Sequence, residues 1–197
     1  MPDIRETWSE LTPHTCQVVL CDLQEEIVAR SKTMLPDALS QSAEVLCRIA
    51  KLFNLPLTLS VVPEGERDPK LIGSLKRFAA GNNQFLRANA SPFRDQATPA
   101  HIAWHARKML IIAGFATEVV VLHAALDALG RGYGVIVAVD ACGGMSERTE
   151  NAALAQIRDS GGIVTSVVSM ATALSPDFTT SQGKQMFKIL QTLRLAS

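Results

Sequence analysis

Residues 108–141 decide the fold and read KMLIIAGFATEVVVLHAALDALGRGYGVIVAVDA. An apolar segment at 109–113 stops at a glycine, and a helical pattern then runs over 117–129 until two further glycines end it. A second apolar segment at 135–139 follows and ends at an aspartate. Two apolar strands that are joined by one helix form a parallel crossover unit. This stretch therefore predicts an α/β protein.

The rest of the chain continues this alternation of strands and helices. We expect strands at 17–21, 57–62, 84–87 and 163–167, and helices at 37–53, 70–79, 95–107 and 147–160. With helices on both faces, these elements predict a three-layer α/β/α fold around a doubly wound, mostly parallel, Rossmann-like sheet of six strands. A further amphipathic helix is expected over 181–195, packed on the domain or on a second subunit.

The helix expected at 117–129 begins with residues that disfavour a helix. Val119, Val120 and Val121 are β-branched and by themselves suit a strand. The apolar residues of the segment nevertheless recur at helical spacing, so we prefer the helix. Thr117 is expected to cap it, with Glu118 in its first turn. Its free backbone amides would then lie at the carboxyl end of the sheet, where open α/β sheets bind ligands.

Composition indicates one domain that spans residues 1–197. The chain is 47% hydrophobic and 19% charged, as in ordinary globular domains. Its formal net charge is zero and it has no basic cluster, which argues against nucleic acid or an anionic membrane as a partner. No apolar run approaches the ~20 residues of a membrane span. A polar N-terminus and four scattered cysteines predict a cytoplasmic protein with free thiols.

Three segments resemble the isochorismatase-like cysteine hydrolase family. The first is the 108–141 unit, with its G-x-x-T-E-V-x-V and V-D-A motifs. In the second, VVLCDLQEEI, Asp22 and Gln24 match the family's D-x-Q. In the third, FLRANASPF, Arg87 stands where most members have lysine and where a branch of octameric hydrolases of unknown substrate has arginine. The resemblance covers most of the chain and implies the fold described above.

The resemblance also implies a role for each matched residue. The family's nucleophilic cysteine lies two residues after T-E, and this chain has Val120 there. Asp22 matches the general acid or base, and Arg87 matches its basic partner. A cis peptide bond is implied between Phe115 and Ala116, and the amides of Ala116 and Val120 would form the oxyanion hole. Three further residues are expected in the pocket: Gln24, Phe93 and Thr117.

Each of these residues also has a purely structural interpretation. Asp22 could cap the end of a strand in solvent, and Arg87 could be a surface charge. We favour a paired site because an unpaired carboxylate after a buried strand is costly. Cys21 and Cys142 are interpreted as core thiols.

Neither a metal nor a cofactor is expected. His101 and His105 are four residues apart, a spacing that is compatible with metal binding, but no third ligand is evident in the sequence, so we interpret them as a solvated helix face. The related nicotinamidases carry an aspartate–histidine metal cluster after the second strand, whereas the loop here, PEGERDPK, has no histidine.

Valine has no lone pair, so it cannot attack a carbonyl. The sequence therefore predicts a hydrolase-like pseudoenzyme with a degenerate Asp22–Arg87–Val120 triad. Such a protein would lack covalent cysteine chemistry and keep a pocket for a small molecule, and we expect it to form a homo-oligomer. Two alternatives stay open. Asp22 could act as acid or base without a covalent nucleophile, on a vinyl ether or a C–N bond, or the motif register could be shifted so that another residue is the nucleophile.

Overall fold

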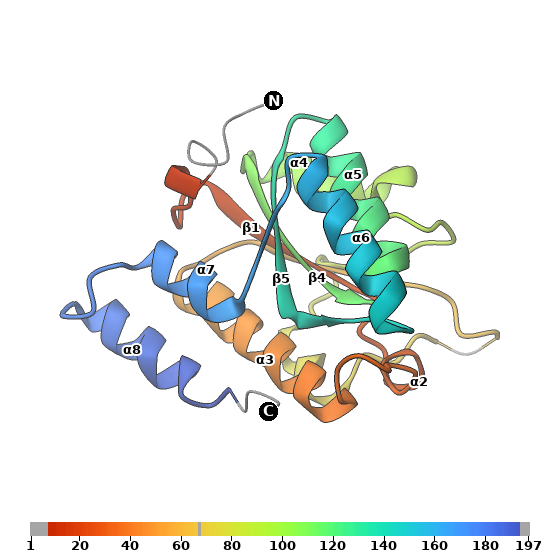
Figure 1. Cartoon of the computed structure of the whole chain (residues 1–197), viewed down its shortest axis with the longest axis horizontal. Coiled ribbons are helices and arrows are strands. Elements are labelled where there is room, and N and C mark those ends of the chain that lie inside the picture. The colour runs from red at the N-terminus through yellow and green to blue at the C-terminus, as the bar shows by residue number, and fades with distance from the viewer. Residues whose placement is uncertain (1–7, 67, 194–197) are drawn as a thin grey trace.

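The structure, a computed structural model, describes residues 8–66 and 68–193 (Figure 1). Its centre is an all-parallel sheet in the order β3-β2-β1-β4-β5-β6. The strands are β1 (Cys16–Cys21), β2 (Leu57–Val61), β3 (Gln84–Leu86), β4 (Met109–Phe115), β5 (Gly134–Gly143) and β6 (Ile163–Thr165). The chain winds from β1 outward to β3 and then from β4 outward to β6. The predicted doubly wound α/β fold is confirmed.

Helices cover both faces of the sheet. α3 (Pro36–Leu52) and α7 (Val167–Leu174) pack on one face, and α4 (Ala97–Trp104), α5 (Leu122–Gly130) and α6 (Glu147–Asp159) lie on the other (Figure 1). Shorter turns are α2 (Glu25–Val28), η1 (Gly73–Phe78), η2 (Pro92–Arg94) and η3 (Thr117–Val121). β1, β4 and most of β5 are fully buried, which explains their almost continuous apolar sequences.

Several elements differ from the sequence-based expectation. β4 continues through its glycine to Phe115, and β5 runs from Gly134 to Gly143, beyond Asp140. The helix expected at 70–79 is only the 3-10 turn η1. The helix expected at 95–107 ends at Trp104, and Ala106 has a positive φ of 52°. The strand expected at 163–167 stops at Thr165, and α7 begins two residues later. It begins there because Ser166 accepts a hydrogen bond from the amide of Ser169, at 3.0 Å, and so caps the helix.

The expected helix after β4 exists, but its first turn is wide. η3 is a single π-helical turn in which the amide of Val121 donates to the carbonyl of Ala116, five residues back, at 3.4 Å. The expectation that Thr117 caps this helix is wrong. Its hydroxyl instead lies 2.7 Å from Glu150 Oε1 and 3.1 Å from the carbonyl oxygen of Gly143. Three consecutive β-branched side chains crowd an ordinary turn, and the wider turn relieves that crowding.

Gly114 allows β4 to lie against β1 at the carboxyl edge of the sheet. Its φ is +146°, and a Cβ atom there would lie 2.0 Å from the carbonyl oxygen of Cys21. Any side chain at this position would therefore push the ends of the two strands apart. Glycine is required where the chain reverses its direction of winding, between β1 and β4.

The expected C-terminal helix is α8 (Ser181–Leu190), and residues 194 and 195 of the expected range lie outside the described residues. Met186 and Leu190 are buried, and α8 packs on α3 (Figure 1). Gln41 Nε2 also donates to the carbonyl of Thr192 at 2.7 Å. The apolar face of this helix is thus covered by its own chain.

In the described part of the chain, no helix combines the length and apolar character that crossing a membrane requires.

Candidate active site

Asp22 and Arg87 form a buried ion pair at the carboxyl edge of the sheet. Asp22 follows β1 and Arg87 follows β3, and their amides are fixed by the carbonyls of Ser60 and Val61 at 2.8 and 2.9 Å. Arg87 NH1 donates to Asp22 Oδ1 at 2.8 Å, and NH2 donates to Oδ2 at 2.7 Å. The side chains are only 1% and 10% exposed for Arg87 and Asp22. The structure thus contains the ion pair between Asp22 and Arg87 that the sequence led us to expect.

The pair has a defined electrostatic character. Burial raises the pKa of Asp22, while the hydrogen bonds and the charge of Arg87 lower it. Both oxygens of the carboxylate are engaged, so the arginine neutralises Asp22 and also fixes its orientation. Arg87 Nε is buried and has no hydrogen-bond partner among the described residues.

Val120 lies in η3, at the start of the helix that follows β4. Its side chain is 1% exposed, and that of Ala116 is 7% exposed. The Phe115–Ala116 peptide bond, for which the resemblance implied a cis conformation, is cis. Gly114 of β4 pairs with Cys21 of β1, so the segments that carry Val120 and Asp22 leave neighbouring strands at one edge. This edge is the point where the direction of winding reverses, which is the usual place for a ligand in such sheets.

Gln24 serves to fix the loop that follows β2. Its side-chain amide nitrogen donates to the carbonyl of Val62 at 3.0 Å and to Glu64 Oε1 at 2.5 Å. Its amide oxygen accepts from the amide of Val62 at 2.8 Å. Gln24 is fully buried, and both polar atoms of its side chain bond to this loop. Its contacts therefore hold the loop in place.

Phe93, which was expected in the pocket, contacts residues that follow α5. The guanidinium of Arg131 lies 5.6 Å from the centre of its ring and donates to its carbonyl at 2.8 Å. The ring of Tyr133 lies 6.2 Å away. Both partners follow the C-terminal end of α5, whereas Val120 precedes the N-terminal end of that helix.

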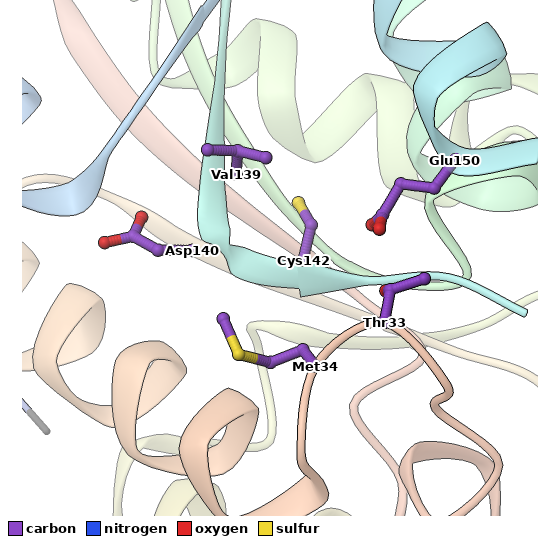
Figure 2. A pocket seen from close by; sticks show the side chains of 6 residues that line it. All are labelled: Thr33, Met34, Val139, Asp140, Cys142 and Glu150. Atoms are coloured by element: carbon purple, nitrogen blue, oxygen red, sulfur yellow. The ribbon is translucent and has the colours of Figure 1, made fainter. Parts of the chain in front are cut away.

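A cavity of about 280 Å³ opens at the carboxyl end of β5 (Figure 2). Strand β5, the loop before α3 and helix α6 contribute its lining, which consists of Thr33, Met34, Val139, Asp140, Cys142 and Glu150. None of the predicted site residues is among these six. Thr117 is connected to the cavity through its contact with Glu150. The sequence drew attention to two of the six, Asp140 as an aspartate that follows an apolar segment and Cys142 as a core thiol.

The cavity combines two carboxyl groups with apolar walls. Asp140 Oδ1 accepts from the amide of Val167 at 2.7 Å, while its Oδ2 is buried without a partner among the described residues. Burial raises the pKa of Asp140, and the hydrogen bond from Val167 opposes that rise. Met34 and Val139 supply apolar surface. Such a lining can accept hydrogen bonds from a small ligand and shield its carbon atoms from water.

The four cysteines of the chain are all free and buried. Burial raises the pKa of Cys21 to about 12, and burial also raises the pKa of Cys142, the cysteine that lines the cavity. A thiol reacts as its thiolate, and burial disfavours that form at both positions.

A doubly wound parallel sheet with a buried ion pair at the edge where its winding reverses defines a Rossmann-like α/β protein. The chain belongs to the isochorismatase family, because residues 16–169 match the isochorismatase domain. Isochorismatase domain-containing protein 2B of Mus musculus is 30% identical over 183 residues, which are 91% of this chain and 82% of that protein.

Two solved structures are similar throughout. YcaC from Pseudomonas aeruginosa, with hexane-2,5-diol and covalent acrylamide, superposes with a TM-score of 0.86 at 26% identity, over 93% of this chain and 91% of the other. The YcaC gene product of Escherichia coli, described as an octameric hydrolase of unknown specificity, gives 0.84 at 27% identity, over 91% and 89%.

Proposed function

We propose that this protein is an isochorismatase-family member that has lost covalent cysteine chemistry and keeps a small-molecule site. The observation that carries the proposal is Val120, a buried isopropyl group in the first turn after β4. An acyl-enzyme route needs a nucleophile at this place, and valine offers none. The buried, protonated cysteines of the chain support the same conclusion.

The remaining site suits binding. In this proposal Asp22 and Arg87 hold the edge of the sheet in shape, and the amides of Ala116 and Val120 stay available to a ligand oxygen. The cavity beside β5 receives the ligand. Its volume of about 280 Å³ is at the lower end of ligand pockets, which favours a compact molecule. Asp140 and Glu150 favour a ligand that carries hydrogen-bond donors.

A second candidate function is hydrolysis in which Asp22 acts as an acid or base without a covalent step. The raised pKa of Asp22 favours it, because a buried carboxyl group is better suited to hold and transfer a proton. The two short hydrogen bonds from Arg87 argue against it, because they occupy both oxygens. We therefore rank it second.

Turnover assays separate the two candidates. We expect no hydrolysis of amides, esters or vinyl ethers by the wild-type protein beyond that of the folded Asp22→Asn variant. Chromatographic detection of products over hours, with and without iodoacetamide, provides the measurement. Wild-type turnover that resists iodoacetamide and is lost in Asp22→Asn would replace our proposal by the acid–base candidate. Turnover that iodoacetamide abolishes would mean that a cysteine is the nucleophile after all.

We also propose that the chain forms a homo-oligomer. The octameric state described for the Escherichia coli relative supports this, as do Trp104 and Leu86, large apolar residues that are 79% and 60% exposed. α8 does not contribute to the argument, because its apolar face is covered by α3. Sedimentation velocity at micromolar concentration should give a mass above that of the 21.2 kDa chain. A monomer at that concentration would contradict the proposal.

A further inference from the structure

Two histidines converge at the end of α4, apart from the candidate active site. His101 lies in the last turn of the helix, and His105 follows Trp104 as its C-terminal cap. Residues four apart share one face of a helix. Here the rings stand edge to face, with centroids 4.7 Å apart, and their Nε2 atoms are 3.3 Å from each other.

The distance between the two nitrogens fits a bound metal ion. Two Zn–N bonds of ~2.05 Å at the tetrahedral angle of ~109° place their nitrogens about 3.3 Å apart. For a direct hydrogen bond between the rings, the same 3.3 Å is longer than the usual range of about 2.7–3.2 Å. The two nitrogens are thus already at the separation that one tetrahedral ion requires, and a bound ion would replace the long hydrogen bond between the two rings.

Aromatic neighbours hold the rings in this arrangement. The ring of Phe85 lies 4.8 Å from that of His101, and the ring of Trp104 lies 5.0 Å from that of His105. Both histidines are partly exposed, so an ion can reach them from solvent. Partial burial lowers the pKa of each imidazole, which favours the neutral form that binds metals. Arg107 is the nearby cation and acts against metal binding.

The geometry points to a two-histidine site on α4, in which His101 and His105 bind one divalent transition-metal ion of the zinc class. Neutral imidazole suits Zn²⁺, Cu²⁺ and Ni²⁺. In the part of the chain that the structure describes, no group of three or more histidine, cysteine or acidic residues could hold a metal. The remaining coordination positions are therefore filled by water or by a second copy of the chain.

Trp104 provides a direct optical probe for the site. The chain has two tryptophans, so Trp8→Phe leaves Trp104 as the sole tryptophan emitter. Cu²⁺ that binds beside His105 should quench this emission in a saturable manner, and Zn²⁺ should bind with a measurable heat in calorimetry. One ion per chain would indicate water in the open positions, and one ion per two chains would indicate that a second copy completes the site. Both outcomes support the proposal.

Histidine variants decide whether this pair is the site. In the His101→Gln and His105→Gln variants, the metal concentration at half-saturation should rise at least about tenfold. Each variant keeps only one imidazole, so the gain from a second ligand at high effective concentration is lost. His14→Ala and His123→Ala serve as matched controls and should leave the affinity unchanged. Far-UV circular dichroism verifies that each variant is folded. Absence of saturable binding in the Trp8→Phe protein, or equal affinity in the folded His101→Gln and His105→Gln variants, would overturn the proposal.

Discussion

Replacing Val120 by cysteine is expected to create the fastest-reacting thiol in the protein. A cysteine at the start of a helix has a lowered pKa, and a fall from about 8.5 to about 7 raises the thiolate fraction at pH 7 roughly tenfold. Acrylamide and iodoacetamide should therefore label residue 120 of the variant about tenfold faster than an ordinary thiol of pKa near 8.5, and faster still than the native cysteines, whose pKa burial raises. Intact-mass and peptide mass spectrometry at pH 7 measure both rates. The wild-type protein should show no adduct at this position.

Neighbouring positions supply the controls. Val119→Cys places a thiol on the exposed side of the same turn, where 46% of the valine is accessible, and it should react at the rate of an ordinary surface thiol. Asp22→Asn in the Val120→Cys background should slow the labelling if Asp22 assists removal of the proton. A folded Val120→Cys protein that stays unlabelled would show that the site has been dismantled beyond its nucleophile. In that case the proposal that the amides of Ala116 and Val120 stay available to a ligand would be wrong.

Replacing Arg87 by methionine is expected to destabilise the fold by about 3–5 kcal/mol, because it leaves a buried carboxylate without its partner. The midpoint and slope of urea denaturation at pH 7 give the free energy of unfolding. The loss should shrink as the pH is lowered. With no arginine beside it, the folded pKa of Asp22 lies further above the unfolded value near 3.8, so the folded protein takes up a proton first. Stability from this group is then present at low pH and is lost as the pH rises through the folded pKa.

Two controls isolate the buried pair. Lys76→Met removes a surface ion pair with Glu25, whose side chains are 57% and 46% exposed, and should change stability by less than ~1 kcal/mol. The double variant Asp22→Asn with Arg87→Met should be more stable than Arg87→Met alone, since it carries no unpaired charge. Asparagine suits position 22 because it tolerates the φ of 54° found there. If the Arg87→Met protein were as stable as the wild type, Asp22 would not be a buried carboxylate that depends on Arg87, and the prediction would be wrong.

The local sequence determined the presence and order of the buried strands, although not all of their ends. Apolar runs such as that of β4 fit a strand that is covered on both faces, and β4 continues through its glycine to Phe115. Because all strands point the same way, residues that follow them must gather at one edge, and the pairing of Asp22 with Arg87 could be predicted for this reason. The valine at position 120 is likewise visible in the sequence alone.

Only the tertiary structure decided which way the remaining side chains point. Thr117 could cap its own helix or bond to Glu150, and the approach of α6 to the end of β5 selects the second. Phe93 receives a hydrogen bond from Arg131, which follows α5, because η2 packs on that helix. The cavity joins a loop near residue 33 to the end of β5 and the start of α6. These segments are distant in the chain, and packing between distant segments leaves no periodic signal in a local pattern of residues.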